Sequence, residues 1–461
     1  MSRASADTLF AALQDVVGDR VSCVETDIES HSGDHSAYKP VRPDVVCYPE
    51  SAADVVAIAR CCQRMETPLV AYGAGSSLEG HVLPVRGGVS LDMQRMNRVV
   101  RVDVEDADCT VQAGVRRKQL NTELEGTGLF FPVDPGADAT LGGMAATRAS
   151  GTSSVRYGTM RDNVIALQVV LADGRLIETG SRARKSASGY DLTRLFVGSE
   201  GTLGVITEVT LRLYPVPSHF VAAVAAFSTL AEAVAVVVQV RRAGLPIARI
   251  ELLDALMMRG INTYAGMSYP EAPTLFMEFS GGEEEVRRQR EWVERRVWAG
   301  GGTSFTWASD AEERAALWHA RHNAHYAAKG LRPGARSKGT DVCVPLSKLT
   351  ECLARVEQDM AGTFLMAPLV GHVGDGNFHL QYLIDPAKPE EVAESERLHE
   401  RLVRHALELG GTCSGEHGVG LGKTRFMQAE HGEALGVLQA IKEALDPQGL
   451  LNPGKMLPPR G

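Results

Sequence analysis

The sequence has no apolar stretch long enough to cross a membrane. A membrane-spanning helix needs about 18 or more consecutive apolar residues, and the longest run here, residues 220–227, has only the length of a strand. The N-terminus also lacks the pattern of a secretory signal, because residues 1–7 are polar and residues 8–17 read as a short amphipathic helix without a cleavage site. We therefore expect neither a transmembrane segment nor a signal peptide.

An excess of basic residues is also lacking. The chain has 48 Lys and Arg against 57 Asp and Glu, a net charge of −9, which argues against a general nucleic-acid-binding protein. Its eight cysteines, of which Cys61 and Cys62 are adjacent, show neither a C-x-x-C pair nor a disulfide framework. A reducing cytoplasm is the simplest location. A peripheral position at the inner membrane stays open, as does a mitochondrial location if this N-terminus is a processed one.

The apolar content is sufficient for more than one core. A chain of 461 residues with 44% hydrophobic content predicts two or three domains. A strand, a helix and a second strand are expected at 45–48, 55–64 and 68–72, and Pro215 and Pro217 indicate a domain boundary. The second half resembles a ferredoxin-like α+β sheet, with strands expected at 220–227, 247–253, 274–280 and 303–307 and helices at 229–243, 283–298 and 309–328.

Two glycine-rich regions predict the close approach of a ligand. Residues 73–80, G-A-G-S-S-L-E-G, follow the second strand and lack the G-x-G-x-x-G spacing, so an NAD-binding fold is disfavoured. Their backbone N–H groups suit a pyrophosphate, helped by the hydroxyls of Ser76 and Ser77, and an ordinary turn is the alternative. In residues 135–162 the many small residues let the backbone approach a flat ligand closely, and a surface loop is the alternative.

A hairpin in the second half carries two histidines. In residues 371–380, G-H-V-G-D-G-N-F-H-L, the central Gly-Asp-Gly-Asn suits a chain reversal. If residues 374–377 form the loop, His372 faces His379 across an antiparallel pair, with Cβ atoms about 4.5–5.5 Å apart. Two imidazoles at that spacing can chelate one metal ion, and a hairpin with surface histidines is the alternative.

A third ligand follows in residues 411–418, G-T-C-S-G-E-H-G, where Glu416 can supply an oxygen to the same ion and His417 is left over. Two histidines and one carboxylate leave open positions on a divalent ion, which suits catalysis better than a structural role. These ligand types accept zinc, manganese or iron.

Seven motifs follow one another along the chain: A-Y-G-A-G-S-S-L-E-G, P-G-A-D-A-T-L-G-G-M, G-S-E-G-T-L-G-V-I-T, T-D-V-C-V-P, G-H-V-G-D-G-N-F-H, G-E-H-G-V-G and L-N-P-G-K. As an ordered set they resemble the FAD-linked D-2-hydroxy-acid dehydrogenases of the vanillyl-alcohol-oxidase type, most closely the D-lactate dehydrogenase (cytochrome) branch.

The resemblance implies an α+β fold with a two-subdomain FAD-binding domain of the vanillyl-alcohol-oxidase type and a ferredoxin-like α+β cap domain. An N-terminal helical segment would take residues 1–40 and the FAD-binding domain residues 41–217. The substrate or cap domain would take residues 218–415, and a C-terminal segment that completes the FAD domain would take residues 416–461.

The resemblance also implies a bound FAD and a divalent metal ion. The metal ligands of the family correspond to His372, His379 and Glu416. Its FAD-contacting loops correspond to Gly73, Gly75, Ser76, Ser77, Leu78, Pro135, Gly136, Thr140, Gly142, Gly143, Ser150, Gly151, Tyr157, Gly158, Gly201, Gly204, Ile206 and Asn452.

Oxidation of a 2-hydroxy acid removes a proton from the hydroxyl group and transfers a hydride from C2 to flavin N5. A metal ion on the three ligands would lower the pKa of that hydroxyl. His417, next to a ligand, is the expected general base, with a structural histidine as the alternative. Arg321 is expected to bind the carboxylate bidentately, with an exposed helix arginine as the alternative. Asn377 either orients the substrate or only serves the turn.

The substrate expected first is D-lactate, with glycolate and D-2-hydroxyglutarate behind it. In the D-2-hydroxyglutarate branch a lysine stands two residues before the aspartate that corresponds to Asp341. Here that position is Gly339, with Lys338 and Arg336 nearby, so a monocarboxylate is favoured. A flavin-bearing subunit of a larger oxidase, like the glycolate oxidase D-subunit, is a second interpretation, and a metal-dependent hydrolase is a third.

The expected partners are a small-molecule D-2-hydroxy acid and an electron acceptor. The sequence does not choose among cytochrome c, a quinone and an electron-transfer flavoprotein as the acceptor, and a homodimer is one option for the assembly.

Overall fold

The computed structural model describes residues 5–459, which form two compact units. The first unit takes the chain up to Ser150, residues Tyr157–Val216 and the chain from Glu416 onward. The second takes Gly151–Arg156 and Pro217–Gly415. The N-terminal segment therefore belongs to the same unit as the glycine loop. Within residues 5–459 no helix is both long and apolar enough to span a bilayer.

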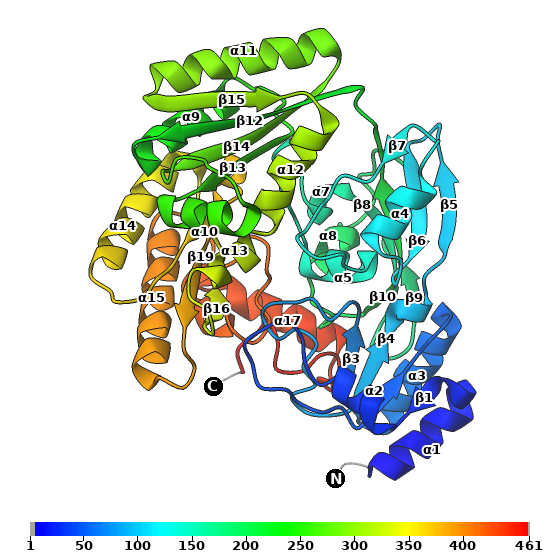
Figure 1. Ribbon diagram of the computed structural model, residues 1–461. Coiled ribbons are helices and arrows are strands. Elements are labelled where there is room, and N and C mark those ends of the chain that lie inside the picture. The colour runs from blue at the N-terminus through cyan, green and yellow to red at the C-terminus, as the bar shows by residue number, and fades with distance from the viewer. Residues whose placement is uncertain (1–4, 460–461) are drawn as a thin grey trace. The chain divides into compact units, whose positions relative to one another are not determined.

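The first unit contains a small, mostly parallel sheet in the order β1 (Val21–Ser22), β2 (Val45–Cys47), β4 (Val89–Asp92) and β3 (Leu69–Tyr72). Strands β2, β4 and β3 run parallel, as the strand-helix-strand prediction requires, and α3 (Ala52–Arg64) connects β2 to β3. Helix α3 includes the expected residues 55–64 and begins directly after Ser51, because Ser51 and Asp54 form a reciprocal capping box. Helices α1 (Ala6–Val17) and α2 (Glu25–Ser30) precede β2, and Leu9 and Leu13 of α1 pack into the core beside α3 (Figure 1).

The other sheet of this unit is antiparallel, in the order β5 (Val99–Asp103), β6 (Asp108–Gln112), β10 (Val205–Arg212), β8 (Val164–Val170) and β9 (Leu176–Glu178). Strands β5 and β6, and strands β8 and β9, pair as antiparallel hairpins. The remaining elements of this part of the chain are α4 (Arg117–Glu123), β7 (Leu129–Phe130), α5 (Leu141–Thr147), α6 (Ser154–Tyr157), α7 (Met160–Asn163), α8 (Leu192–Phe196) and β11 (Tyr214–Pro215).

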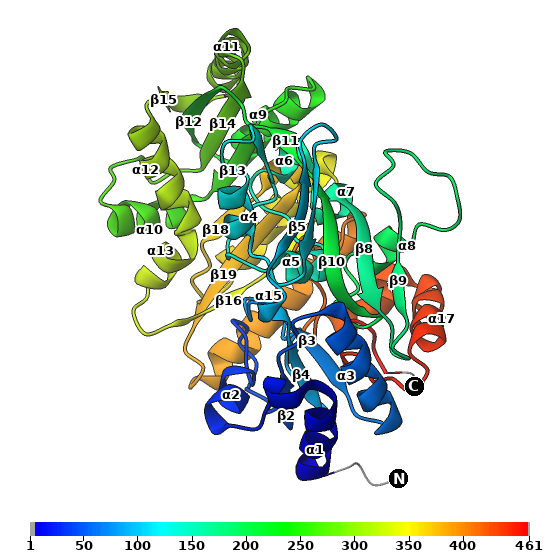
Figure 2. The ribbon, with the colours of Figure 1, turned by 90° about the vertical axis from the view of Figure 1, so that its right-hand side faces the viewer.

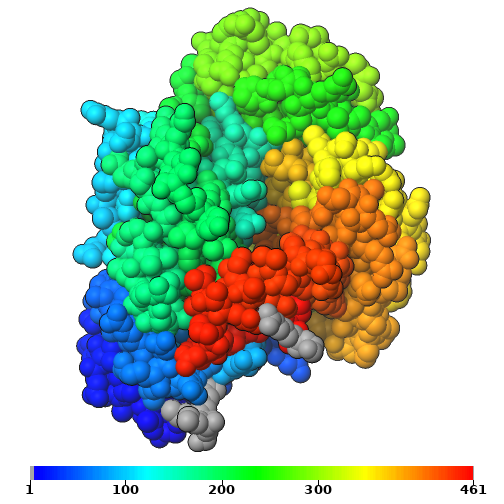
Figure 3. All heavy atoms as spheres, turned by 180° about the vertical axis from the view of Figure 1, so that it is seen from behind, coloured from blue at the N-terminus to red at the C-terminus, as the bar shows by residue number. Residues whose placement is uncertain are grey.

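The C-terminal segment completes the first unit. Leu451 forms a parallel bridge with Leu69 of β3, and Lys442 Nζ donates to the carbonyl of Thr202 at 2.7 Å. Figure 3 shows this red segment lying against the blue N-terminal part of the chain. The helical part of this segment is divided, because Gly432 takes a φ of 52° between α16 (Met427–His431) and α17 (Ala434–Leu445).

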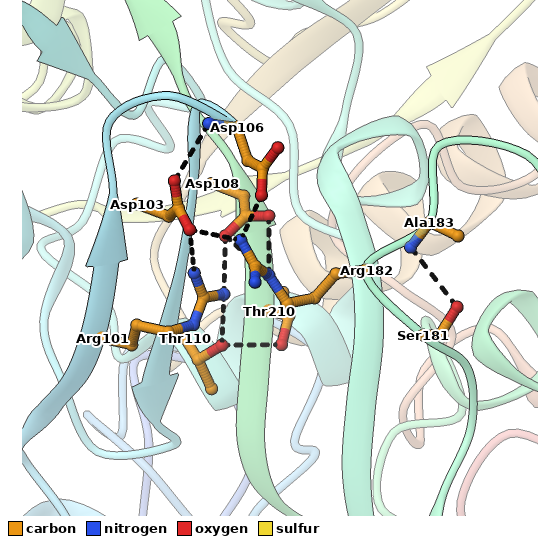
Figure 4. Close-up of polar contacts among 9 residues, drawn as sticks. All are labelled: Arg101, Asp103, Asp106, Asp108, Thr110, Ser181, Arg182, Ala183 and Thr210. Carbon is orange, nitrogen blue, oxygen red and sulfur yellow. Dashed lines mark hydrogen bonds and ion pairs between the residues drawn. The ribbon is translucent and has the colours of Figure 1, made fainter.

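One long loop of the first unit is held by a single arginine. Residues 181–190 are exposed and extend from β9 toward α8 (Figure 2). Arg182 Nη2 donates to Asp103 Oδ2 and to Asp106 Oδ2, each at 2.7 Å. Its Nε donates to Asp108 Oδ2 at 3.0 Å (Figure 4). The Asp106 backbone N–H, followed by the Arg182 guanidinium, lowers the pKa of Asp103.

We expect Arg182→Ala to loosen this loop. Arg184 and Lys185 lie in its exposed part, so trypsin should cut there several-fold faster once the contacts to three aspartates are gone. Limited proteolysis followed by mass spectrometry measures this rate. The control is Arg175→Ala, since Arg175 is exposed and pairs with Asp173 inside its own hairpin turn. Equal cleavage rates in the two variants would contradict the anchoring role of Arg182.

The second unit is built on one large sheet, in the order β15 (Gly302–Ala308), β12 (His219–Phe227), β14 (Thr274–Gly281), β13 (Arg249–Leu253), β18 (Leu369–Gly371), β19 (Asn377–Ile384) and β16 (Arg336–Gly339), with β17 (Val342–Cys343) also paired to β19. Its first four strands in sequence occupy the spatial order 4-1-3-2, with helices after the first and third. This is the ferredoxin-like arrangement that the sequence predicts.

Helices cover both faces of this sheet. Helices α9 (Leu230–Arg242), α11 (Glu283–Ala299), α14 (Leu349–Ala361) and α15 (Pro389–Glu408) form one layer, and α10 (Ala255–Ala265), α12 (Ala311–His322) and α13 (Ala324–Gly330) form the other. The sequence did not predict α10 or β16. The helix expected over 309–328 is divided at Asn323, which ends α12.

Candidate functional site

The histidine hairpin forms, but its register differs from the prediction. Val370, not His372, is the cross-strand partner of His379. Strand β18 ends at Gly371, and residues Val373–Asp375 form a short 3-10 turn before Gly376 with a φ of 80°. His372 therefore lies diagonally from His379. Their rings remain close, with centroids 5.6 Å apart and planes at 82°.

The hydrogen bonds of the two histidines leave the lone pair on Nε2 of each ring. His372 Nδ1 lies 2.8 Å from Glu251 Oε1, and His379 Nδ1 lies 2.9 Å from the Thr340 carbonyl oxygen. Both partners are acceptors, so each Nδ1 carries the proton and donates it. In each ring Nε2 is then the nitrogen able to bind a metal ion, which fits the donor set of a histidine-ligated site.

Asn377 and Asp341 form a buried polar cluster beside the histidines. Asn377 Nδ2 donates to Asp341 Oδ1 at 2.9 Å and to the Val342 carbonyl at 2.7 Å, so the side chain does more than serve the turn. Its Oδ1 is buried and has no hydrogen-bond partner among residues 5–459. Ser414 Oγ donates to Asp341 Oδ2 at 2.8 Å, which fixes the chain two residues before Glu416.

Arg321 is buried rather than exposed, which removes the exposed-arginine alternative. Its Nε donates to Glu251 Oε2 at 3.0 Å, and Nη2 donates to the same oxygen. The bidentate binding of a substrate carboxylate by Arg321 stays a prediction, and one edge of the guanidinium, Nε and Nη2, is already used by Glu251. Nη1 lies on the other edge of the guanidinium and takes no part in this pair.

In the first unit, the glycine loop touches the start of α5. A β-carbon at Gly73 would lie 2.5 Å from Thr140 Oγ1, so only glycine permits this approach. Thr140 caps α5 by accepting from the Gly143 N–H at 3.3 Å. The hydroxyl of Ser77, expected to assist a pyrophosphate, donates to Asp34 Oδ2 at 2.7 Å instead.

A buried carboxylate joins three segments of this unit. Glu200 accepts from the N–H groups of Val419 and Gly420 at 2.7 and 2.9 Å, and His81 Nε2 lies 3.3 Å from it. Burial alone would raise the pKa of Glu200, but His81 and the two N–H groups hold it below its usual value. Asn452 Nδ2 donates to the carbonyls of Glu200 and His81 at 2.7 and 3.0 Å.

The environment of His81 fits a bound cofactor. The ring is 4% exposed, and its Nδ1 has no hydrogen-bond partner within the described part of the chain. A buried nitrogen without a partner is costly, and the polar groups of FAD would satisfy it. Gly136 offers open space as well, since a β-carbon there would meet no atom within 4 Å.

The other expected FAD-contacting residues divide between loops and core. Gly142 packs against Ala113 and Gly204 against Val169, while Ile206 is buried in the core. Tyr157 contacts Phe130 and Tyr214 edge to face, with ring centroids 5.6 and 4.9 Å away. Gly75, Ser76, Leu78, Pro135, Ser150, Gly158 and Gly201 lie in loops of the first unit, whereas Gly151 belongs to the second.

The loop that follows Gly415 carries Glu416, the expected third metal ligand, and His417, the expected general base. Ser150 Oγ donates to Glu416 Oε2 at 2.6 Å. His417 is half-buried, and the next residue, Gly418, has a φ of 85°. A β-carbon at Gly418 would come within 2.6 Å of His81 Nε2, which explains the glycine.

Sequence reasoning missed Glu251 and Glu200 as site residues. Glu251 stands between Ile250 and Leu252 in the strand R-I-E-L-L, and a carboxylate flanked by apolar strand residues is a usable signal that it has a buried partner. Glu200 lies in one of the seven motifs, and its positive φ of 54° is rare for a residue other than glycine, but this conformation cannot be read from sequence.

Comparison with known proteins gives matches over most of the chain. The family model "FAD linked oxidases, C-terminal domain" matches residues 216–456, and "FAD binding domain" matches residues 43–180. A "Probable D-lactate dehydrogenase, mitochondrial" from Danio rerio is 47% identical over 459 residues, covering 98% of this chain and 92% of its own. A "D-lactate dehydrogenase (cytochrome), mitochondrial" from Arabidopsis thaliana is 47% identical over 427 residues, covering 92% of this chain and 75% of its own.

Among solved structures, that of p-cresol methylhydroxylase with substrate bound aligns with a TM-score of 0.78 at 18% identity. The alignment covers 97% of this chain and 96% of that chain. This likeness confirms the fold, a vanillyl-alcohol-oxidase-type FAD-binding domain with an α+β cap.

Proposed function

Because the chain belongs to the FAD-linked oxidase family and is an FAD-dependent oxidoreductase, we propose that it oxidises D-lactate to the corresponding 2-keto acid. The observation that carries this proposal is the bonding around Glu251. This one carboxylate holds both His372, a residue suited to bind a metal ion, and Arg321, a cation suited to bind a carboxylate. A 2-hydroxy acid presents a hydroxyl and a carboxylate on adjacent carbons. Its binding therefore needs a metal ligand and a carboxylate-binding cation close together.

The protein would bind two groups for this reaction, FAD and a divalent metal ion. FAD, held by the glycine loops and Asn452, would accept the hydride from C2, and a divalent ion held by His372, His379 and Glu416 would act as a Lewis acid on the hydroxyl. Zinc, manganese and iron all suit these ligands. Arg321 would hold the substrate carboxylate through Nη1.

His417 would take the hydroxyl proton, since it adjoins Glu416 and is half-buried. Asn377 would orient the substrate, because its buried Oδ1 can accept a hydrogen bond while its Nδ2 stays on Asp341. These roles draw on the sequence resemblance and on the contacts within each unit.

A monocarboxylate fits the cap better than a dicarboxylate. Lys338, the cation nearest to the position of the second carboxylate-binding lysine, pairs with Glu396 at 2.5 Å. Gly339 itself has no side chain to bind a second carboxylate. D-lactate is therefore placed ahead of D-2-hydroxyglutarate, and glycolate stays the alternative of similar size.

Membership of an FAD-linked family disfavours the hydrolase interpretation. The electron acceptor, a homodimer and a role as subunit of a larger oxidase stay predictions. The cytoplasmic location also stays a prediction, while the two relatives are mitochondrial by name.

The test is an anaerobic absorbance spectrum of the purified protein before and after the addition of D-lactate. We expect a visible absorbance band of oxidised flavin that D-lactate bleaches and L-lactate leaves unchanged. A band that neither isomer bleaches would overturn D-lactate as the substrate, and glycolate and D-2-hydroxyglutarate would then be tested in the same way.

A further inference from the structure

We propose that Glu251 is a positioning residue that fixes the metal-ligating histidine and the carboxylate-binding arginine relative to each other. The inference rests on the proposed function, because it assigns Glu251 a role toward the ion and the substrate named there. Glu251 itself would touch neither, since both of its oxygens are used within the protein.

The contacts of Glu251 connect three distant parts of the cap. Glu251 lies on β13, in the middle of the sheet, and is 1% exposed. Its Oε1 accepts from His372, which follows β18, while its Oε2 accepts from Arg321 on α12. A carboxylate has two oxygens in one rigid plane, so the imidazole and the guanidinium cannot move independently.

Each contact determines which atoms remain for the ligand. By accepting from His372 Nδ1, Glu251 fixes the tautomer in which Nε2 bears the lone pair that a metal ion needs. By accepting from Nε and Nη2 of Arg321, it turns the edge that carries Nη1 away from the strand. The charges of Glu251 and Arg321 cancel, so neither the buried carboxylate nor the buried guanidinium is left without a counter-charge.

Glu251 is not the only residue of β13 that holds α12 in place. Helix α12 is held to β13 by Trp318 as well, because the Arg249 guanidinium lies 4.8 Å from the centre of the Trp318 ring. Trp318 and Arg321 are three residues apart on α12, and Arg249 and Glu251 are two apart on β13, so the two pairs lie side by side. The position of α12 does not depend on Glu251 alone.

The experiment uses the full-length FAD-loaded protein, stripped of metal and titrated with Zn²⁺, with Mn²⁺ in parallel. For Glu251→Gln we expect unchanged FAD content and a metal Kd weakened by about 10–100-fold. We also expect a KM for D-lactate raised by about tenfold, because Arg321 loses its charged anchor. A matched control is Glu278→Gln, since Glu278 is also buried, lies on the adjacent strand β14 and pairs with Arg249 at 3.4 Å. It should leave the metal Kd and KM at wild-type values.

A double variant, Glu251→Gln with Arg321→Met, guards against misfolding because it leaves no unpaired buried arginine. The thermal midpoint of the double variant should be higher than that of Glu251→Gln alone. Its metal Kd should stay weak, because His372 still lacks its carboxylate partner. A metal Kd restored to the wild-type value would overturn the positioning role. So would a single Glu251→Gln variant whose metal Kd and KM match those of Glu278→Gln.

The proposed function and this inference fail in different ways. If His372→Ala binds the metal ion as tightly as wild type does, the metal site itself is wrong. If His372→Ala loses the ion and Glu251→Gln keeps wild-type metal Kd and KM, the metal site stands and only the role of Glu251 is wrong.

Discussion

Replacing His372 with Ala should abolish turnover of D-lactate while the protein keeps its FAD. Loss of a Lewis acid removes several kcal/mol of transition-state stabilisation, and about 4 kcal/mol corresponds to about 10³-fold in rate. FAD retention should not change, because the glycine loop and Asn452 belong to the first unit and His372 to the second. Steady-state kinetics and the absorbance ratio of flavin to protein measure the two quantities on one sample.

Glu416→Ala should behave in the same way if it is the third ligand. The control is His405→Ala, since His405 is also a cap histidine paired with a carboxylate, with Nε2 2.9 Å from Asp359 Oδ2, but it belongs to α15 and not to the hairpin. It should keep wild-type turnover. Activity that survives both His372→Ala and Glu416→Ala would remove the metal assignment altogether.

Replacing His417 with Gln should slow the reduction of FAD itself. A positioned general base contributes about 10²–10⁴-fold to a proton transfer, so stopped-flow bleaching of the flavin by D-lactate should slow by that factor. Metal content should remain, because His417 is assigned as base and not as ligand. This combination separates His417 from the two ligand histidines, whose loss should also release the ion.

A second histidine of the C-terminal segment provides the comparison for His417. His431 ends α16, and its Nε2 lies 4.0 Å from a carboxylate oxygen of its neighbour Glu430. His431→Gln should reduce FAD at the wild-type rate. If His417→Gln is equally fast, the proton is taken by another group and His417 is a structural histidine.

The local sequence predicted most elements because each rests on contacts between near neighbours. The start of α3 follows from Ser51 and Asp54, which satisfy each other's backbone N–H groups within one turn. The β8–β9 hairpin follows from Asp173 and Gly174, whose φ of 76° only glycine adopts readily. Such signals did not locate the breaks at Asn323 and Gly432, where one helix ends and the next begins.

The residue types of the candidate site were readable from the sequence, and the ordered motifs sufficed to identify the family and the FAD-binding fold. The pairing of those residues was not readable. The prediction that His372 faces His379 was wrong by two positions, because the hairpin turns through a short helical segment and not a four-residue loop. The two rings nevertheless meet, since a shift of two residues keeps a side chain on the same face of a strand.

The sequence by itself determined the apolar and polar periodicities, the turns and the set of chemically capable side chains. Only the tertiary structure decided which of them share hydrogen bonds. Glu251 meets His372 across 121 residues and Arg321 across 70, and both contacts exist because β13 and β18 become neighbours in the sheet and α12 packs on the same strand. The physical reason is that a buried charge requires a partner, while strand order and helix packing choose which partner it finds.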